Sequence, residues 1–337
     1  MRNIVTFDEY NEVEIKPSTL IKKYISLVKE NVSKFFLEGE CLRHSPCPGC
    51  LGNKISSSFV KFGLHYVECV KCGTLWISPR PDDEALRHYY SESEARKFWR
   101  DELSLMTKRK RKEKIVKPRY QWIVDSTLEY HPNATHILAI NTNQDIVIGE
   151  ISSVDHFKRK TILDPFVSVD DSQVSGLDII RTSLYEVDII DDVDAITLFE
   201  VADRTSNVEE LFRKVHRMLK RGGLCFMTDI LGSGFDLQVL WDQAENLFPP
   251  DRLNVFTVNG LHYLFERHGF KCQEFSTPGV LDVEIVRMAF SEKPELGLPR
   301  FLNYLVKNSR EQVRKSFSEF LQSNLLSSYG RIMLQKL

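Results

Sequence analysis

A short apolar stretch near the middle of the chain, Ile137–Asp145, sets the strongest limit on how this protein folds. It stops abruptly at polar, turn-forming residues, which predicts a buried strand that leads through a loop into a helix. A second such run, Thr161–Leu163, ends at Asp164. Strand, helix and strand in succession predict parallel strands joined by a right-handed crossover. Because ligands bind outside the carboxyl ends of such strands, we expect Asn141 to Asp145 and Asp164 to lie at a binding site.

The same alternation continues along the chain and predicts an α/β fold, with a largely parallel sheet and helices on both faces. The predicted strands cover residues 137–140, 161–163, 178–182, 194–201, 224–229 and 270–275, with helices at 208–219 and 260–268 among them. Two amphipathic helices, 301–307 and 311–326, precede a last strand at 331–335. We therefore expect a helical insertion, about residues 277–326, to cover the ligand end of the sheet.

Four of the seven cysteines form two Cys-x-x-Cys pairs, Cys47 with Cys50 and Cys69 with Cys72. Each pair fits a tight turn that aims two thiolates at one point, and two such turns complete a closed tetrahedral zinc site. Sulfur fills all four positions, so the zinc is predicted to be structural. The alternative, four unrelated core cysteines, does not explain this spacing. The span around the pairs is therefore interpreted as a zinc ribbon.

These patterns divide the chain into four predicted parts. An N-terminal helical segment covers residues 1–40, the zinc ribbon 41–81, a helical connector 82–130, and the α/β domain with its insertion 131–337. The apolar spacing in the first segment predicts a packing helix rather than a partner-binding one.

Composition limits the partners and the location. The net charge is −2, so the chain as a whole does not attract nucleic acid or anionic lipid. No apolar run is long enough to span a bilayer. The first ten residues lack the pattern of a secretory signal, and paired cysteines suit a reducing compartment, so we expect a cytoplasmic protein.

One basic run, Lys108–Lys114, needs separate treatment. Clustered Lys and Arg side chains can neutralise phosphates, which would favour a nucleic-acid partner. The run stands alone, however, and no aromatic residues are interleaved with it. We therefore interpret it as the solvated face of a connecting helix and do not expect nucleic acid to bind.

Several segments together carry a resemblance to a known family. They are residues 47–50, 69–73, 78–81, 194–201, 219–223, 247–254, 276–283 and 324–328. In these segments the chain resembles class I S-adenosylmethionine-dependent methyltransferases that carry an N-terminal zinc ribbon. The resemblance implies a Rossmann-like methyltransferase sheet, S-adenosylmethionine as cofactor and a small-molecule or sugar substrate. A fold so widely shared does not by itself fix the function.

The cofactor loop departs from the pattern of that family. There the first strand ends in Asp-x-Gly-x-Gly-x-Gly, whose glycines let the backbone approach the cofactor. The corresponding positions here are Ala139, Asn141, Asn143 and Asp145. Asparagine tolerates positive φ better than other non-glycine residues, so the loop can keep its shape while side chains fill the groove. The charge of Asp145 would also oppose the cofactor carboxylate.

Two further positions match the cofactor site of the family more closely. Asp164 stands where an acidic residue would hydrogen-bond the ribose, although an ordinary loop carboxylate explains it equally well. Asp203 stands with Arg204 where the family often has Glu-His. The resemblance therefore implies one set of cofactor-binding positions: Ala139, Asn141, Asn143, Asp164 and Asp203.

The acceptor side is inferred from the same resemblance. Residues 251–254 would line the acceptor pocket, but Arg252 stands where the family commonly has His. A permanent cation thus replaces the most obvious base, and it could clamp a carboxylate or phosphate. The candidate catalytic residues are Asp251, Arg252 and His262, and the candidate acceptor-binding residues are Asn254, Asp282 and Glu284. A lone helical His such as His262 is more often a surface or core residue than a base.

Two hypotheses for the function remain. The first is a methyltransferase acting on a sugar, nucleotide-sugar or surface-polysaccharide intermediate. The second is a catalytically inactive pseudo-methyltransferase that serves as a binding or scaffold subunit for a protein partner. The glycine-free loop favours the second hypothesis, whereas the retained polar positions at Asp164, Asp203 and the acceptor side favour the first.

Overall fold

A computed structural model describes residues 17–140, 151, 154–167 and 176–337. The predicted cofactor loop, with Asn141, Asn143 and Asp145, lies outside the described residues. So does most of the helix expected between the first two strands of the sheet.

Seven strands form the central sheet, in the order β12-β13-β10-β9-β6-β7-β8. In chain order they are β6 (His136–Ile140), β7 (Arg159–Leu163), β8 (Asp178–Ile180), β9 (Val193–Phe199), β10 (Leu219–Ile230), β12 (Phe270–Ser276) and β13 (Tyr329–Lys336). Neighbouring strands from β10 to β8 run parallel, whereas β13 runs antiparallel to both β10 and β12. This largely parallel sheet, with a late antiparallel strand, confirms the predicted α/β Rossmann-like class.

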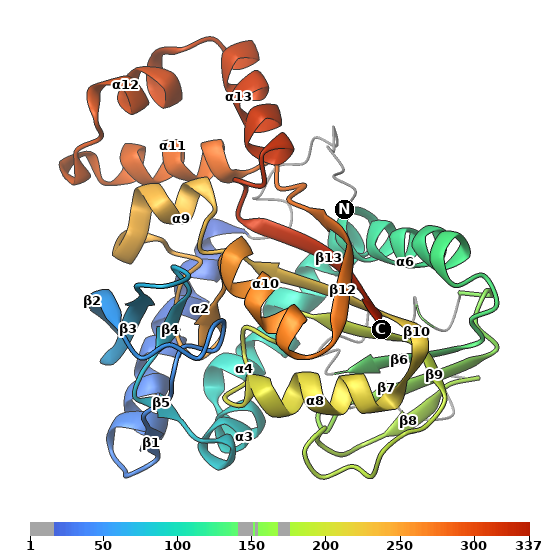
Figure 1. Cartoon of the computed structure of the whole chain (residues 1–337). Coiled ribbons are helices and arrows are strands. Elements are labelled where there is room, and N and C mark those ends of the chain that lie inside the picture. Colours follow the sequence, from blue (N-terminus) through green and yellow to red (C-terminus); the bar gives the residue numbers. More distant parts are fainter. Residues whose placement is uncertain (1–16, 141–150, 152–153, 168–175) are drawn as a thin grey trace.

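Helices cover both faces of the sheet (Figure 1). On one face lies α6 (Lys117–Tyr130), whose Trp122 and Ile123 pack with β6 and β10. On the other lie α8 (Val208–Met218) and α10 (Val258–Arg267). Asn207 caps α8 by accepting a hydrogen bond from the Glu210 N–H, as a short polar side chain does at a helix start. Apolar side chains at helical spacing then bury one face of each helix.

A second, smaller sheet lies beside the cysteine pairs, and Cys69 is the last residue of its strand β3. Its strands are β2 (Ile55–Lys61), β3 (Leu64–Cys69) and β4 (Leu75–Ile77), all antiparallel. A fourth strand, β11 (Asn254–Val255), pairs with β4 but comes from the α/β part of the chain. A separate two-stranded pair joins β1 (Leu42–Arg43) to β5 (Arg80–Pro81). The two parts of the chain therefore share one sheet.

The N-terminal and connecting segments are helical, as expected. The first segment holds α2 (Ser18–Val32), followed by a π-helical turn at Ser33–Leu37. The connector holds α3 (Asp83–Glu92), α4 (Glu94–Phe98), a π-helical stretch at Trp99–Ser104, α5 (Leu105–Arg111), a second such stretch at Lys112–Val116, and then α6. The exact domain limits stay a prediction.

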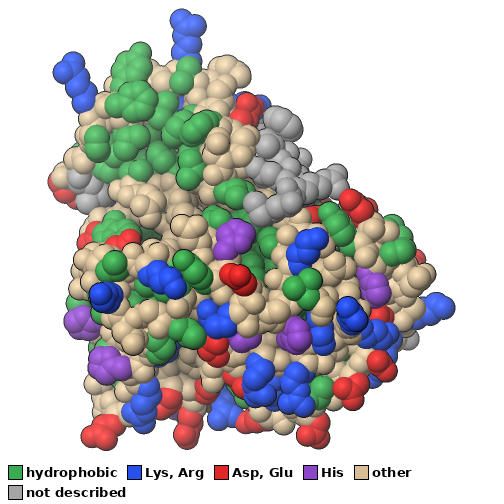
Figure 2. All heavy atoms as spheres, in the orientation of Figure 1, with side chains coloured by type: hydrophobic (Ala, Val, Ile, Leu, Met, Phe, Trp, Pro, Cys, Tyr) green, Lys and Arg blue, Asp and Glu red, His purple; other side chains and the backbone are tan. Residues whose placement is uncertain are grey.

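The insertion between β12 and β13 is also helical. It contains α11 (Asp282–Glu292), a short 3-10 turn at Pro294–Leu296, α12 (Arg300–Asn303), a π-helical turn at Tyr304–Asn308, and α13 (Glu311–Ser323). Sequence periodicity predicted the last three of these regions, as helices over 301–307 and 311–326, but not α11 or the 3-10 turn. Figure 2 shows hydrophobic side chains gathered over this insertion, where Phe301, Tyr304 and Phe320 are exposed. In the described ranges, no helix combines the length and apolarity that crossing a membrane requires.

Candidate functional site

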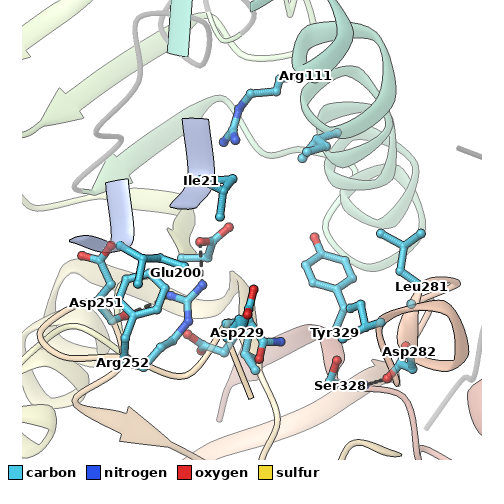
Figure 3. A pocket seen from close by; sticks show the side chains of 18 of the residues that line it. Ile21, Arg111, Glu200, Asp229, Asp251, Arg252, Leu281, Asp282, Ser328 and Tyr329 are labelled. Carbon is cyan, nitrogen blue, oxygen red and sulfur yellow. Dashed lines mark hydrogen bonds and ion pairs between the residues drawn. The ribbon is translucent and has the colours of Figure 1, made fainter. Parts of the chain in front are cut away.

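A cavity of about 380 Å³ opens at the carboxyl ends of β9 and β10. Ile21 and Tyr24 of α2 form one wall, and Asp282 and Ile285 of α11 form another. The start of β13 contributes Tyr329 (Figure 3). This is the edge of the sheet at which a parallel α/β protein is expected to bind its ligands.

Asp229, near the end of β10, is the most unusual residue of the cavity. Its side chain is fully buried, and neither carboxylate oxygen has a hydrogen-bond partner among the residues that the structure describes. Burial, together with repulsion from Asp203, raises its pKa well above the usual range. Figure 3 shows it at the floor of the cavity, between Arg252 and Tyr329. A buried polar group without a partner is costly, so this position has capacity for a ligand.

A cluster of ion pairs lies beside this floor, where β9 ends. Glu200 accepts hydrogen bonds from Nη2 of Arg119 at 3.2 Å, of Arg204 at 3.2 Å and of Arg252 at 3.4 Å. Its backbone has φ +55°, a conformation that few side chains adopt without constraint. Burial opposes its ionisation, but the arginines outweigh burial and hold the pKa of Glu200 well below the usual range.

Two of these arginines, Arg204 and Arg252, also engage the second carboxylate of this region, Asp203. Arg252 donates to Asp203, which is fully buried and does not line the cavity. Arg252, one of the predicted catalytic residues, is therefore paired with two carboxylates, Glu200 and Asp203, and is not free to bind a ligand. Arg252 does line the cavity, as predicted, but its partners were not foreseen.

Two other predicted carboxylates reach the cavity. Asp251 accepts a hydrogen bond from the Tyr24 hydroxyl at 2.7 Å. Asp282 accepts from the Ser327 hydroxyl and from the Ser328 backbone N–H, both at 2.6 Å. Both carboxylates are thus fixed by partners from distant parts of the chain, and Asp282 also anchors the start of α11 to the start of β13.

The structure places three predicted residues elsewhere. Asn254 is fully buried in β11 and donates to the carbonyls of Ala202 and Thr205, so it braces the loop after β9. His262 is exposed on α10, and Glu284 pairs with Arg287 on the exposed side of α11. None of the three lines the cavity. These positions do not support the predicted catalytic and acceptor-binding roles, which stay predictions.

Of the predicted cofactor positions, the two described ones at strand ends, Ala139 and Asp164, lie next to the cavity rather than in it. Ala139 is buried within β6, opposite Thr197 of β9. This register sets the end of β6 beside the end of β9, and hence close to Glu200. Asp164 is buried at the end of β7, where its Oδ1 accepts a hydrogen bond from the Phe166 N–H at 2.9 Å.

The four cysteines converge as the spacing predicted. All four Sγ atoms lie within 4.8 Å of one another, with Cys47 to Cys72 at 3.5 Å and Cys50 to Cys69 at 3.4 Å. Sulfurs about 2.3 Å from a central ion would stand at similar separations. The group can therefore hold a metal ion.

The cysteine-bearing sheet is attached directly to the cavity. The Tyr66 hydroxyl of β3 donates to the Arg252 carbonyl at 2.6 Å. The Ile77 N–H donates to the Leu253 carbonyl at 2.9 Å, just before β11 joins the sheet. The backbone that carries Asp251 and Arg252 is thus held by the ribbon.

The sequence did not predict several residues that line the cavity. In the sequence, Asp229 lies within an apolar strand and looks like an ordinary strand residue. Glu200 lies at the end of another predicted strand, with no sign of a special role. Arg111, Arg119 and Tyr329 also line the cavity. Only the helical phase of Arg111, four residues from Thr107 and from Ile115, could have signalled its inward position.

Comparisons with known proteins agree with this architecture. Residues 120–274, somewhat under half of the chain, match a family model described as a methyltransferase domain. The match confirms the predicted resemblance to S-adenosylmethionine-dependent methyltransferases, and the cysteine cluster is compatible with a zinc ribbon. No curated protein sequence matches the chain significantly.

Solved structures similar in fold include several methyltransferases. The plantazolicin methyltransferase BpumL shares 13% identity, covers 74% of this chain and 94% of its own, with a TM-score of 0.42. Coclaurine N-methyltransferase shares 12% identity, with 64% and 72% covered and a TM-score of 0.39. A methyltransferase from Mesorhizobium loti shares 12% identity, with 65% and 98% covered and a TM-score of 0.39. Similarities this weak carry no argument about the substrate.

Proposed function

We propose that the protein transfers a methyl group from S-adenosylmethionine to a small molecule bound in the cavity, since residues 120–274 match a family model described as a methyltransferase domain. The single observation that carries the proposal is the position of Asp229. This buried carboxyl without a partner faces a cavity at the ligand-binding edge of the sheet. A structural cavity would be expected to satisfy its own polar groups.

The described residues fit the cofactor at one anchor. Asp164 lies at the end of the strand next to β6, and the Phe166 N–H fixes the orientation of its carboxylate. A carboxylate held in this way suits the ribose hydroxyl groups of the cofactor. When bound, S-adenosylmethionine supplies a sulfonium methyl group that an acceptor atom attacks in line.

On the acceptor side, Asp229 is suited to handle a proton. An acceptor hydroxyl must lose its proton as the bond to the methyl carbon forms, and a carboxylate within hydrogen-bond reach can take it. Burial and repulsion from Asp203 raise the pKa of Asp229, so its carboxylate is a stronger base than an exposed aspartate. A sugar or nucleotide-sugar would present hydroxyl groups of this kind, and we propose that class of substrate.

The four cysteines are proposed to hold a structural zinc ion. Four sulfur ligands leave no position open for a substrate. The contacts of Tyr66 and Ile77 with the 252–253 backbone give the ribbon a role in shaping the acceptor side. The cytoplasmic location and the protein partner stay predictions.

Calorimetric titration with S-adenosylmethionine and with S-adenosylhomocysteine tests the proposal. We expect saturable binding of both, followed by transfer of a radioactive methyl group to a member of a nucleotide-sugar panel. An Asp229→Asn variant should keep cofactor binding and lose transfer. Absence of binding at millimolar ligand would defeat the proposal.

One observation favours the alternative, an inactive binding subunit. Glu200 and its three arginines compensate one another's charge at the end of β9, without a ligand. A structural ion cluster at this place would serve a scaffold equally well. The same titration separates the two functions, because a scaffold that has lost the cofactor site would give no heat with either compound.

A further inference from the structure

Arg111 occupies a position that a helix normally gives to an apolar residue. It lies on the same helical stripe as Leu103 and Thr107, at a spacing of four residues, and all three side chains are buried. Lys108, Arg109 and Lys110 of the same basic run are exposed. The basic run was predicted to be a solvated face of a helix. That prediction is correct for Lys108, Arg109 and Lys110. It is wrong for Arg111, which is only 8% exposed and lines the cavity.

The guanidinium group of Arg111 lacks a carboxylate partner among the described residues. Its one contact of note is the ring of Trp99, whose centroid lies 5.3 Å from the guanidinium carbon. The other arginines around Glu200 differ, since Arg119, Arg204 and Arg252 each pair with that carboxylate. Figure 3 shows the Arg111 side chain reaching into the cavity from the wall opposite Asp229.

An arginine in this setting is prepared for an anion. Arginine stays protonated in proteins, so burial leaves a charge that its surroundings must compensate. Burial does lower the pKa of Arg111, and the charge of Glu200 opposes this only in part. The ring of Trp99 packs against one face of the Arg111 guanidinium. The N–H groups of that guanidinium can donate hydrogen bonds to two oxygen atoms of one ligand group.

We propose that Arg111 is the anion-binding residue of the cavity and that it takes a carboxylate or phosphate group of the bound ligand. The inference rests on the proposed function for the identity of the ligand. Two sources share this chemistry: the methionine carboxylate of the cofactor, and an anionic group of the acceptor. Asp229 would then face the opposite end of whatever occupies the cavity.

The test compares anionic ligands with matched compounds that lack the anion. 5′-Methylthioadenosine carries a methyl group on sulfur where S-adenosylhomocysteine carries the amino-acid chain with its carboxylate and amine. Pyrophosphate and uridine diphosphate represent a phosphate-bearing acceptor. Each is titrated into the wild type, into Arg111→Gln and Arg111→Met, and into Arg109→Gln as a control. Arg109 belongs to the same run, but its side chain is 87% exposed.

The expected result is at least a tenfold loss of affinity in both Arg111 variants for one anionic ligand, with no change in Arg109→Gln. A loss confined to S-adenosylhomocysteine identifies the cofactor carboxylate as the anion. A loss confined to pyrophosphate and uridine diphosphate identifies the acceptor. Equal affinities in wild type and Arg111 variants for all of these ligands would overturn the inference.

A second measurement separates binding from structural support. Without ligand, Arg111→Met should unfold at a higher temperature than the wild type, because it removes a buried charge that has no partner. A lower unfolding temperature would show that Arg111 supports the fold and would contradict the inference. Failure of the proposed function is distinct, since it would appear as no binding of either adenosine compound in any variant.

Discussion

Replacing Glu200 by Gln should destabilise the protein strongly, because one carboxylate compensates three buried cations. The side chains of Arg119, Arg252 and Arg204 are only 11%, 12% and 19% exposed. Arg252 keeps Asp203 after the change, whereas Arg119 keeps no carboxylate among the described residues and retains the Tyr329 hydroxyl and the rings of Phe199 and Tyr329. Removing one partner of a buried pair costs about 3–5 kcal/mol. Gln retains an oxygen acceptor, so we expect a loss of stability at the lower end of this range, about 3 kcal/mol at pH 7.

The pH dependence of this loss follows from the direction of the pKa shift. The arginines depress the pKa of Glu200 in the folded state, so its charge stabilises the fold above the unfolded pKa of about 4.3. As pH falls below that value, each unit removes about 1.4 kcal/mol of this contribution. The difference between wild type and Glu200→Gln should therefore shrink by about 2 kcal/mol between pH 7 and pH 3.

Urea denaturation followed by tryptophan fluorescence measures both quantities. The matched control is Glu186→Gln, whose carboxylate pairs with Arg87 on an exposed surface, and it should unfold at the same urea concentration as the wild type. The reasoning is refuted if Glu200→Gln also unfolds with the wild type at pH 7. It is equally refuted if the difference at pH 7 persists unchanged at pH 3.

Three further predictions concern other parts of the structure. Metal analysis should find one zinc ion per chain, and Cys47→Ser should lose this ion. A ribbon that stays folded after the metal is removed by a chelator would contradict the proposed zinc site. The stability of Asp229→Asn relative to the wild type should increase as pH rises from about 5 to 8 in denaturation experiments. The reason is that the pKa of Asp229 is raised in the folded state, so ionisation of the wild type above about pH 3.9 costs folding free energy. A difference in stability between the two proteins that does not change with pH would contradict the burial of Asp229. Gly260→Ala would bring a Cβ to 2.0 Å from the Thr74 Oγ1, so denaturation should show a loss of about 1–3 kcal/mol, and an unchanged stability would contradict this close packing.

Short-range patterns were enough to predict the sheet and the cysteine cluster. The strand over 137–140 is found as His136–Ile140, and the last strand over 331–335 as Tyr329–Lys336. Both depend on runs of apolar residues whose length and spacing are local properties. The Cys-x-x-Cys spacing similarly fixes two sulfurs at each turn before any tertiary contact forms.

Features that depend on distant contacts were not predictable. β11 has only two residues, and its pairing with β4 joins segments far apart in the chain. In the sequence, Asp229 resembles one polar residue in a buried strand, and only the arrangement of the surrounding elements places it beside a cavity. Asn254 was placed in the acceptor pocket by resemblance, whereas its amide is used to hold two backbone carbonyls.

The most direct test of the whole account is a crystal structure of the protein soaked with S-adenosylhomocysteine. We predict density for the adenosine against Asp164, with the sulfur directed toward the cavity that contains Asp229. Side chains of the 141–145 loop filling that crevice, with no nucleoside bound at millimolar ligand, would contradict the account.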